Sequence, residues 1–110
     1  MARVRWEVDF YKTEAGRRPA EQWLSRQSPG VRAKFAHVAR LLEEYGLEVS
    51  RPHVAPVRGE IWEMRAVGTD KRMLYVATPG NRLIILHGFA KGGSKVPDRD
   101  LKIAERRAAD

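Results

Sequence analysis

Three strand-like segments between residues 60 and 90 constrain the fold most strongly. Residues 60–67, 72–77 and 82–90 are short, largely apolar segments of the length typical of strands. The intervening sequences at 68–70 and 78–81 are short and rich in Gly, Pro, Asn, Asp and Thr. Connections of this length join antiparallel neighbours, so we predict a three-stranded antiparallel meander.

The N-terminal part predicts one more strand and two helices. Residues 4–11 alternate, which places Val4, Trp6, Val8 and Phe10 on one face. Pro19 suits the first turn of a short helix over 20–27. A longer helix is predicted from Val31 to Gly46 by an apolar stripe formed by Val31, Phe35, Val38, Leu41, Leu42 and Tyr45.

The whole chain, residues 1–110, reads as one small α+β domain of the order β-α-α-β-β-β-α. Residues 47–58 contain two prolines and are predicted to form a connecting loop. A last helix is predicted over 98–108, with acidic residues early and basic residues late, as the helix dipole favours. We expect the helices to cover one face of the sheet and to leave the other face partly open.

Charge and composition exclude several classes of protein. The chain has 21 Lys and Arg against 14 Asp and Glu, a net charge of +7. Residues 1–50 contribute 9 − 7 = +2 and residues 51–110 contribute 12 − 7 = +5, so a polyanion is the expected partner. The chain has no cysteine, which excludes disulfides and thiolate metal sites and suits a reducing compartment such as the cytoplasm. The longest apolar run is 83–86, too short to span a membrane.

Period two predicts which side chains share a face of the meander. In 60–67, Glu63 and Arg65 lie on the face opposite Met64, and in the next strand Arg72 lies opposite Met73. In the third strand the alternation places His87 and Lys91 on the face of Leu83, Ile85 and Phe89. A face or sheet end that carried Glu63, Arg65, Arg72, His87 and Lys91 together would be a polar concavity, but which faces coincide depends on the strand register, which the sequence leaves open.

These residue types suit RNA cleavage without a metal ion. The 2′-hydroxyl of RNA attacks the adjacent phosphate when a base accepts its proton, an acid protonates the leaving oxygen and cations stabilise the developing charge. Glu63 is a candidate base and His87 a candidate acid. The candidate cations are Arg65, Arg72, Lys91 and Lys95. An ordinary cross-strand ion pair beside a half-buried histidine explains the same pattern, so the residues alone leave both interpretations open.

Several ordered motifs resemble the RelE/ParE toxin superfamily, and most of all its phage-derived HigB-like branch. They are Val57-Arg58-Gly59-Glu60-Ile61-Trp62-Glu63-Met64-Arg65, Lys71-Arg72-Met73-Leu74-Tyr75, Leu86-His87-Gly88-Phe89-Ala90-Lys91 and Lys95-Val96-Pro97. The resemblance implies a curved antiparallel sheet packed on N-terminal helices. It also implies a toxin of a type II toxin–antitoxin system that cleaves mRNA on the ribosome and needs no cofactor or metal.

The resemblance also implies partners and residue roles. A cognate antitoxin, of the helix-turn-helix, HigA-like kind, is expected to neutralise the protein. The implied catalytic residues are Arg65, Arg72, His87, Lys91 and Glu63, and the implied RNA-binding residues are Arg58, Lys71 and Lys95. Many relatives have a second lysine where this chain has Gly92. Two alternatives with the same fold are a ParE-like toxin that binds DNA gyrase and a catalytically inactive binding module.

Overall fold

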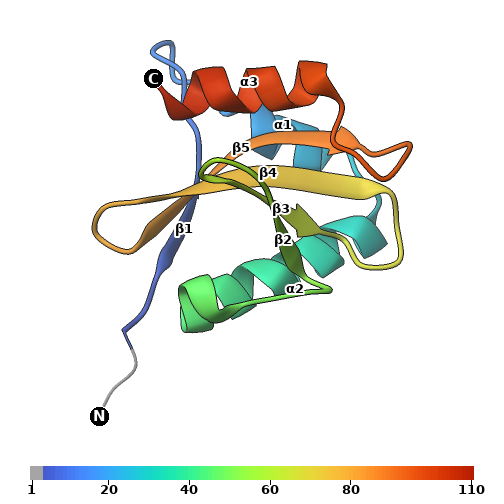
Figure 1. The fold of residues 1–110 in the computed structure, drawn as a ribbon, viewed down its shortest axis with the longest axis horizontal. Helices are drawn as coiled ribbons and strands as arrows, with labels where there is room; N and C mark the ends of the chain where they lie inside the picture. Colours follow the sequence, from blue (N-terminus) through green and yellow to red (C-terminus); the bar gives the residue numbers. More distant parts are fainter. Residues whose placement is uncertain (1–3) are drawn as a thin grey trace.

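The computed structural model describes residues 4–110, which contain five strands, three α-helices and one short 3-10 helix (Figure 1). In chain order they are β1 Glu7–Phe10, α1 Pro19–Ser25, α2 Pro29–Tyr45, η1 Gly46–Glu48, β2 Val54–Arg58, β3 Ile61–Arg65, β4 Lys71–Thr78, β5 Arg82–Ala90 and α3 Asp98–Ala108. Every predicted helix and strand is present. The α+β class, the helix–strand order and the N-terminal packing helices are confirmed.

The strands form one sheet in the order β1-β5-β4-β3-β2. β3, β4 and β5 pair as the predicted antiparallel meander. β1 pairs with β5 in parallel, because the two helices that follow β1 carry the chain across before it enters the meander. The sheet is therefore antiparallel except along one edge.

One strand lies in the segment that the sequence predicts as a loop. β2 pairs antiparallel with β3, with Val54 opposite Met64 and Ala55 opposite Glu63. Its Pro56 cannot donate to a ladder, and a proline is tolerated in an edge strand because no strand follows on that side. The loop prediction for residues 54–58 is wrong because the prolines indicate a loop, whereas an edge strand also tolerates a proline.

α1 and α2 pack on one face of the sheet. The Ser28 hydroxyl caps α2 by accepting a hydrogen bond from the Val31 amide. The predicted apolar stripe of α2 buries Phe35, Val38 and Leu42. They join one core cluster with residues from α1, β2, β3, β4 and β5, namely Ala20, Val54, Met64, Ala66, Met73, Tyr75, Leu83 and Ile85.

α3 covers the opposite face, so the expectation that all helices lie on one side is wrong. Leu101 and Ala104 of α3 are buried in a second cluster with Ile61, Leu74, Val76, Leu86 and Phe89. In Figure 1, α3 and α2 lie on opposite sides of the sheet. The open face that the sequence suggested is thus reduced to the part that α3 leaves uncovered.

A β-bulge in β5 changes the predicted faces of that strand. Leu74 pairs with His87 but Tyr75 pairs with Ile85, so Leu86 is the extra residue. Leu83 and Ile85 consequently belong to the α2 cluster, whereas Phe89 belongs to the α3 cluster. Strict alternation predicts that Leu83, Ile85 and Phe89 share one face, and this prediction is wrong because the bulge interrupts the alternation.

None of the helices in residues 4–110 has the length and apolar character needed to cross a membrane.

Candidate functional site

A buried carboxylate organises the polar end of the sheet. Glu63 is 1% exposed on the central part of β3, between apolar residues of both neighbouring strands. Its Oε2 accepts a hydrogen bond from Arg65 Nε at 3.0 Å, and its Oε1 accepts one from Lys91 Nζ at 3.0 Å. The Nε of Arg72 lies 3.8 Å from Oε1. We call these four residues the Glu63 cluster.

The strand register explains why these residues meet. Arg65 ends β3 and Arg72 lies opposite it near the start of β4. Lys91 follows the end of β5, and its amide donates to the Asp70 carbonyl at 2.7 Å. Three strands thus deliver one cation each to the same end of the sheet. With three cations and one carboxylate, the Glu63 cluster carries a formal charge of 3 − 1 = +2.

Arg72 is the most constrained of the three cations. Its Nη1 donates to the carbonyl oxygens of Thr69 at 2.7 Å and Lys71 at 2.9 Å, while its Nε is buried without a hydrogen-bond partner. Burial lowers the pKa of Arg72 from its ordinary value, and the nearby Glu63 carboxylate acts in the opposite direction. The guanidinium is therefore fixed behind Glu63 as a stationary positive charge.

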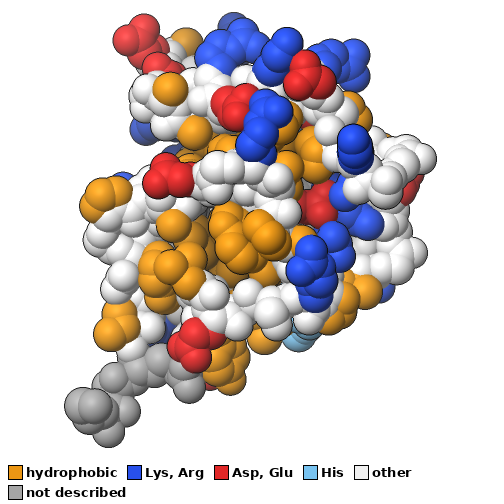
Figure 2. All heavy atoms as spheres, viewed as in Figure 1, with side chains coloured by type: hydrophobic (Ala, Val, Ile, Leu, Met, Phe, Trp, Pro, Cys, Tyr) orange, Lys and Arg blue, Asp and Glu red, His pale blue; other side chains and the backbone are white. Residues whose placement is uncertain are grey.

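A hollow of about 400 Å³ opens beside the cluster. It lies between β2, the end of β3 and the segment that joins β5 to α3, and we call it the basic hollow. Its charged lining residues are Arg51, Arg58, Glu63, Arg65, Lys91 and Lys95. Figure 2 shows Lys and Arg side chains gathered along the right-hand side of this view. An anion that entered the hollow would meet Arg65, Lys91 and Lys95 together.

The structure separates His87 from the rest of the predicted site. Glu63, Leu74 and His87 are consecutive across β3, β4 and β5, so about 10 Å separates the backbones of Glu63 and His87. His87 Nε2 lies 2.7 Å from Oδ1 of Asp100 on α3, and its ring stacks on Phe89 at a centroid distance of 5.9 Å. The predicted concavity therefore forms around Glu63, Arg65, Arg72 and Lys91, and His87 does not line the basic hollow.

Arg58 and Lys71, the other predicted RNA-binding residues, differ in their position relative to the basic hollow. Arg58 lines the basic hollow and donates to both carboxylate oxygens of Glu105 on α3, at 3.2 and 3.0 Å. Lys71 lies outside that lining and pairs with Asp70 at 3.5 Å. Arg58 is therefore available at the basic hollow, whereas Lys71 lies at the turn beside it.

Sequence reasoning missed Arg51, Ser94 and Asp100. Arg51 and Ser94 line the basic hollow from loops, where no periodicity indicates direction. Asp100 is only 6% exposed, although acidic side chains are rarely buried without a partner. Its position next to Leu101, on the apolar side of the predicted last helix, is the sequence signal that would have indicated a partner for His87.

The basic hollow can bind an anion, and its cations are of the kinds that bind phosphate. Guanidinium and ammonium groups bind phosphate oxygens by charge-assisted hydrogen bonds. Both Glu63 oxygens already accept hydrogen bonds from cations, which orients Arg65 and Lys91 before any ligand arrives. The arrangement can thus hold a phosphodiester and stabilise extra negative charge on it.

Two solved structures have the same fold as this chain. One is the archaeal RelE–RelB complex from Pyrococcus horikoshii OT3, with a TM-score of 0.61 and 15% identity over 82% of this chain and 99% of that chain. The other is a double arginine-to-alanine mutant of the E. coli toxin RelE in the free state, with a TM-score of 0.62 and 13% identity over 94% of this chain and 97% of that chain.

Sequence comparison identifies the family. No curated protein is significantly similar to the chain. Residues 22–109 match the family described as "Phage derived protein Gp49-like (DUF891)". That match begins in α1 and includes α2, α3 and the strands of the Glu63 cluster. The chain therefore belongs to the phage-derived Gp49-like family, and its fold is that of the RelE toxins.

Proposed function

We propose that this protein is the toxin of a type II toxin–antitoxin pair and cleaves mRNA on the ribosome without a metal ion. The observation that carries the proposal is the Glu63 cluster, which orients Arg65 and Lys91 at the basic hollow. The RelE-like fold and the Gp49-like family support it. We also propose that the protein belongs to the HigB-like branch of these toxins, because the motifs around Arg65, Arg72 and Lys91 resemble that branch.

The proposed reaction is an internal phosphoryl transfer. The 2′-oxygen of one ribose forms a bond to the adjacent phosphorus while the bond from phosphorus to the 5′-oxygen breaks. The 2′-proton passes to a base, and the 5′-oxygen receives a proton from an acid. Negative charge grows on the non-bridging oxygens in between, and the cations at the basic hollow stabilise it.

Arg65 binds the scissile phosphate in this proposal, Arg72 stabilises its charge from a distance, and Lys91 and Lys95 bind the flanking backbone. Arg65 and Lys91 act at the basic hollow, and Arg72 acts mainly through its field from behind Glu63. Arg58 and Lys71 extend the positive surface for RNA on either side of the cluster.

Proton transfer is assigned to Glu63 and His87. Both Glu63 oxygens are engaged, so the carboxylate accepts a proton only after the bound phosphate takes over Arg65 or Lys91. In the resting protein, Glu63 is a positioning residue for those cations. His87 is oriented by Asp100 and lies one strand further away, so its action needs a movement of the site or a relay.

A cognate antitoxin is the proposed partner. The Pyrococcus structure contains RelE together with RelB, which supports a proteinaceous partner for this chain as well. We propose a helix-turn-helix, HigA-like antitoxin that covers part of the basic hollow. Charge complementarity favours acidic residues in the segment that binds there.

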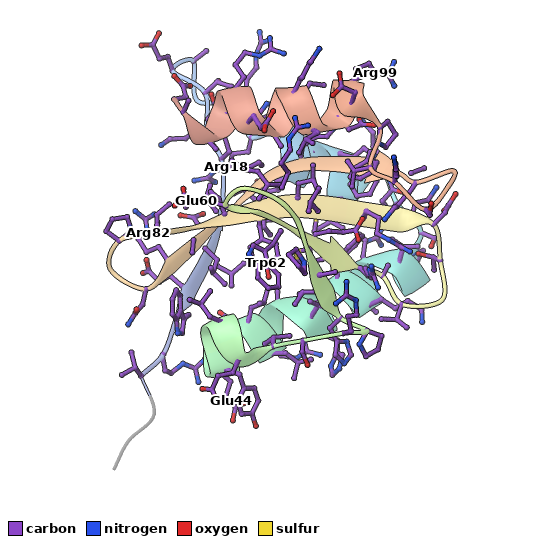
Figure 3. The ribbon with its side chains drawn as sticks, in the orientation of Figure 1. Arg18, Glu44, Glu60, Trp62, Arg82 and Arg99 are labelled. Carbon is purple, nitrogen blue, oxygen red and sulfur yellow. The ribbon has the colours of Figure 1, made fainter. Side chains whose placement is uncertain are left out.

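Induced expression of the intact chain tests this function. We expect growth arrest and, by primer extension on a translated message, new 5′ ends that appear only after induction. Arg65→Ala combined with Arg72→Ala removes two cations of the cluster and should abolish both effects. Arg82→Ala is the matched control, because Arg82 lies at the opposite end of the sheet, paired with Glu7 and Asp9 (Figure 3). New 5′ ends that persist in the double variant would overturn the assignment.

A gyrase assay distinguishes the ParE-like alternative from cleavage of mRNA. Supercoiling by purified gyrase should be unchanged by this protein if it acts on mRNA. Inhibition of supercoiling without mRNA cleavage would identify a gyrase-binding toxin. Normal growth on overexpression of a folded protein would identify an inactive binding module.

A further inference from the structure

A second hollow, of about 250 Å³, lies on the other side of the β3–β4 turn from the basic hollow. It is bounded by α2, by the segment before β2 and by Val67 in the turn between β3 and β4, and we call it the histidine hollow. Its lining residues are Ala33, Lys34, His37, Val38, His53 and Val67. Its wall is thus apolar apart from one ammonium and two imidazoles.

The two imidazoles form an edge-to-face pair with an unused polar atom. The ring centroids of His37 and His53 are 5.6 Å apart, and the ring planes meet at 70°. His53 Nδ1 is buried and has no hydrogen-bond partner. Buried polar atoms in folded proteins are normally paired, so this nitrogen can become a contact for a ligand in the hollow once the His53 ring turns to expose it.

The histidine hollow adjoins the basic hollow along two stretches of backbone. Arg51 and Arg65 line the basic hollow, and His53 and Val67 line the histidine hollow. Each of the two segments therefore supplies one residue to each hollow, two positions apart in the chain. The Arg65 amide donates to the His53 carbonyl at 2.9 Å and fixes the two segments together.

The lining suits a nucleobase. Single-stranded RNA is recognised by stacking its unpaired bases on aromatic side chains, including histidine, and by hydrogen bonds to the base edges. The apolar wall from Val38 and Val67 and the His37 ring accommodate the faces of a base, and the His53 ring offers its Nδ1 to the base edge once it turns toward the hollow. Lys34 stands at the rim, with its Nζ 4.0 Å from the position that a Cβ on Gly68 would take, where it meets a phosphate.

A metal ion fits the histidine hollow less well. Within residues 4–110 no third His, Asp or Glu completes a set of metal ligands. The Lys34 ammonium on the same wall repels a cation.

A hollow of this volume is also smaller than the usual site for a drug-sized organic ligand.

We propose that the histidine hollow holds one unpaired base of the RNA strand whose phosphate occupies the basic hollow. This inference rests on the proposed function, since it assigns a base-recognition subsite next to the scissile bond. His37 and His53 then contribute to which base the protein accepts there. The cations at the basic hollow contact the backbone and carry no sequence information.

NMR of the three histidine side chains tests the proposal directly. The probes are four 2′-O-methylated trinucleotides, one for each base, which cannot be cleaved, and an abasic trinucleotide with the same charge. We expect a base-bearing probe to shift the imidazole resonances of His37 and His53 and the abasic probe to leave them in place. His37→Ala should weaken binding of the base-bearing probe about five- to tenfold, as loss of a stacking partner does.

Two more variants complete the design. His53→Ala removes the free Nδ1 and should reduce the differences in affinity among the four trinucleotides. Arg40→Ala removes an exposed cation of α2 that does not line the hollow, and it should change affinity less than twofold. His37 is exposed on α2, so its replacement leaves the fold intact, and a circular dichroism spectrum verifies this.

Three results would overturn the inference. They are imidazole signals that no trinucleotide moves, equal affinity for the abasic probe, and a response of the His pair to zinc ions alone. Binding of the trinucleotides does not require cleavage, so these results test the base-binding inference alone. The proposed function has its own test, and it is wrong if induced expression yields no new 5′ ends.

Discussion

Replacement of Glu63 by glutamine tests whether one buried carboxylate holds the site together. The substitution keeps the shape of the side chain and removes its charge. The amide oxygen can still accept from Arg65, but the amide nitrogen then faces another donor, the Lys91 ammonium. Three cations remain crowded together around a neutral group.

The expected loss of stability follows from burial. Glu63 is 1% exposed, and removal of one partner from a buried ion pair costs about 3–5 kcal/mol because it leaves uncompensated charge. For a domain of this size, about 4 °C of melting temperature corresponds to 1 kcal/mol. We therefore expect Glu63→Gln to lower the melting temperature by about 12–20 °C.

Glu105→Gln is the matched control. It removes the charge from another carboxylate that accepts two hydrogen bonds from an arginine, Arg58, but the two side chains are 41% and 53% exposed. An exposed pair of this kind contributes little to stability, because solvent screens its charges. Thermal and urea unfolding at pH 7, followed by circular dichroism, measure both variants.

Equal stability of the two variants would refute the reasoning. It would mean that the cations around Glu63 relax into solvent when the carboxylate is neutralised, and that Glu63 is not needed to position them. A folded Glu63→Gln protein that retains full mRNA cleavage would in addition exclude Glu63 as the base.

The remaining predictions concern the first core cluster and its helices. Burial raises the pKa of the Tyr75 phenol above its ordinary value of 10.0, so the unfolded chain loses this proton first and stability is lost as the pH rises above about 10. Urea unfolding between pH 9 and 11 should show a smaller loss for Tyr75→Phe than for the original chain, and equal losses would contradict this. Gly88→Ala would place a Cβ 2.2 Å from the Trp23 ring and should destabilise the protein by about 1–3 kcal/mol in thermal unfolding, through displacement of α1. Gly92→Ala, where a Cβ meets no atom within 4 Å, is its control, and a comparable loss there would contradict the packing argument.

Local patterns were sufficient for most of the elements. The turn residues at 68–70 and 78–81 and the alternation around them predict β3, β4 and β5, and the apolar stripe predicts α2. In each case the signal depends on neighbours a few residues apart. β2 was missed because an edge strand with a proline has neither full alternation nor a complete ladder.

The candidate site was predictable only in part. The alternation correctly put Glu63 and Arg65 on one face of β3, and the observed register, which pairs Arg65 with Arg72, brings Arg72 to the same face. His87 was assigned to the same site, but Leu74 of β4 lies between it and Glu63, and its ring contacts Asp100 of α3 instead. No sequence pattern indicates the hollow between Arg51 and Lys91, because both residues lie in loops whose course depends on distant elements.

The sequence by itself determined every strand and α-helix except β2, which side chains share a face within β3, and the basic character of the C-terminal half. Periodicity and turn chemistry act over a few residues, and the chain displays them directly. The tertiary structure decided the parallel pairing of β1, the position of α3 and the surroundings of Glu63. Those features depend on contacts between residues far apart in the chain, where the burial of one carboxylate against three cations fixes a geometry that no local pattern specifies.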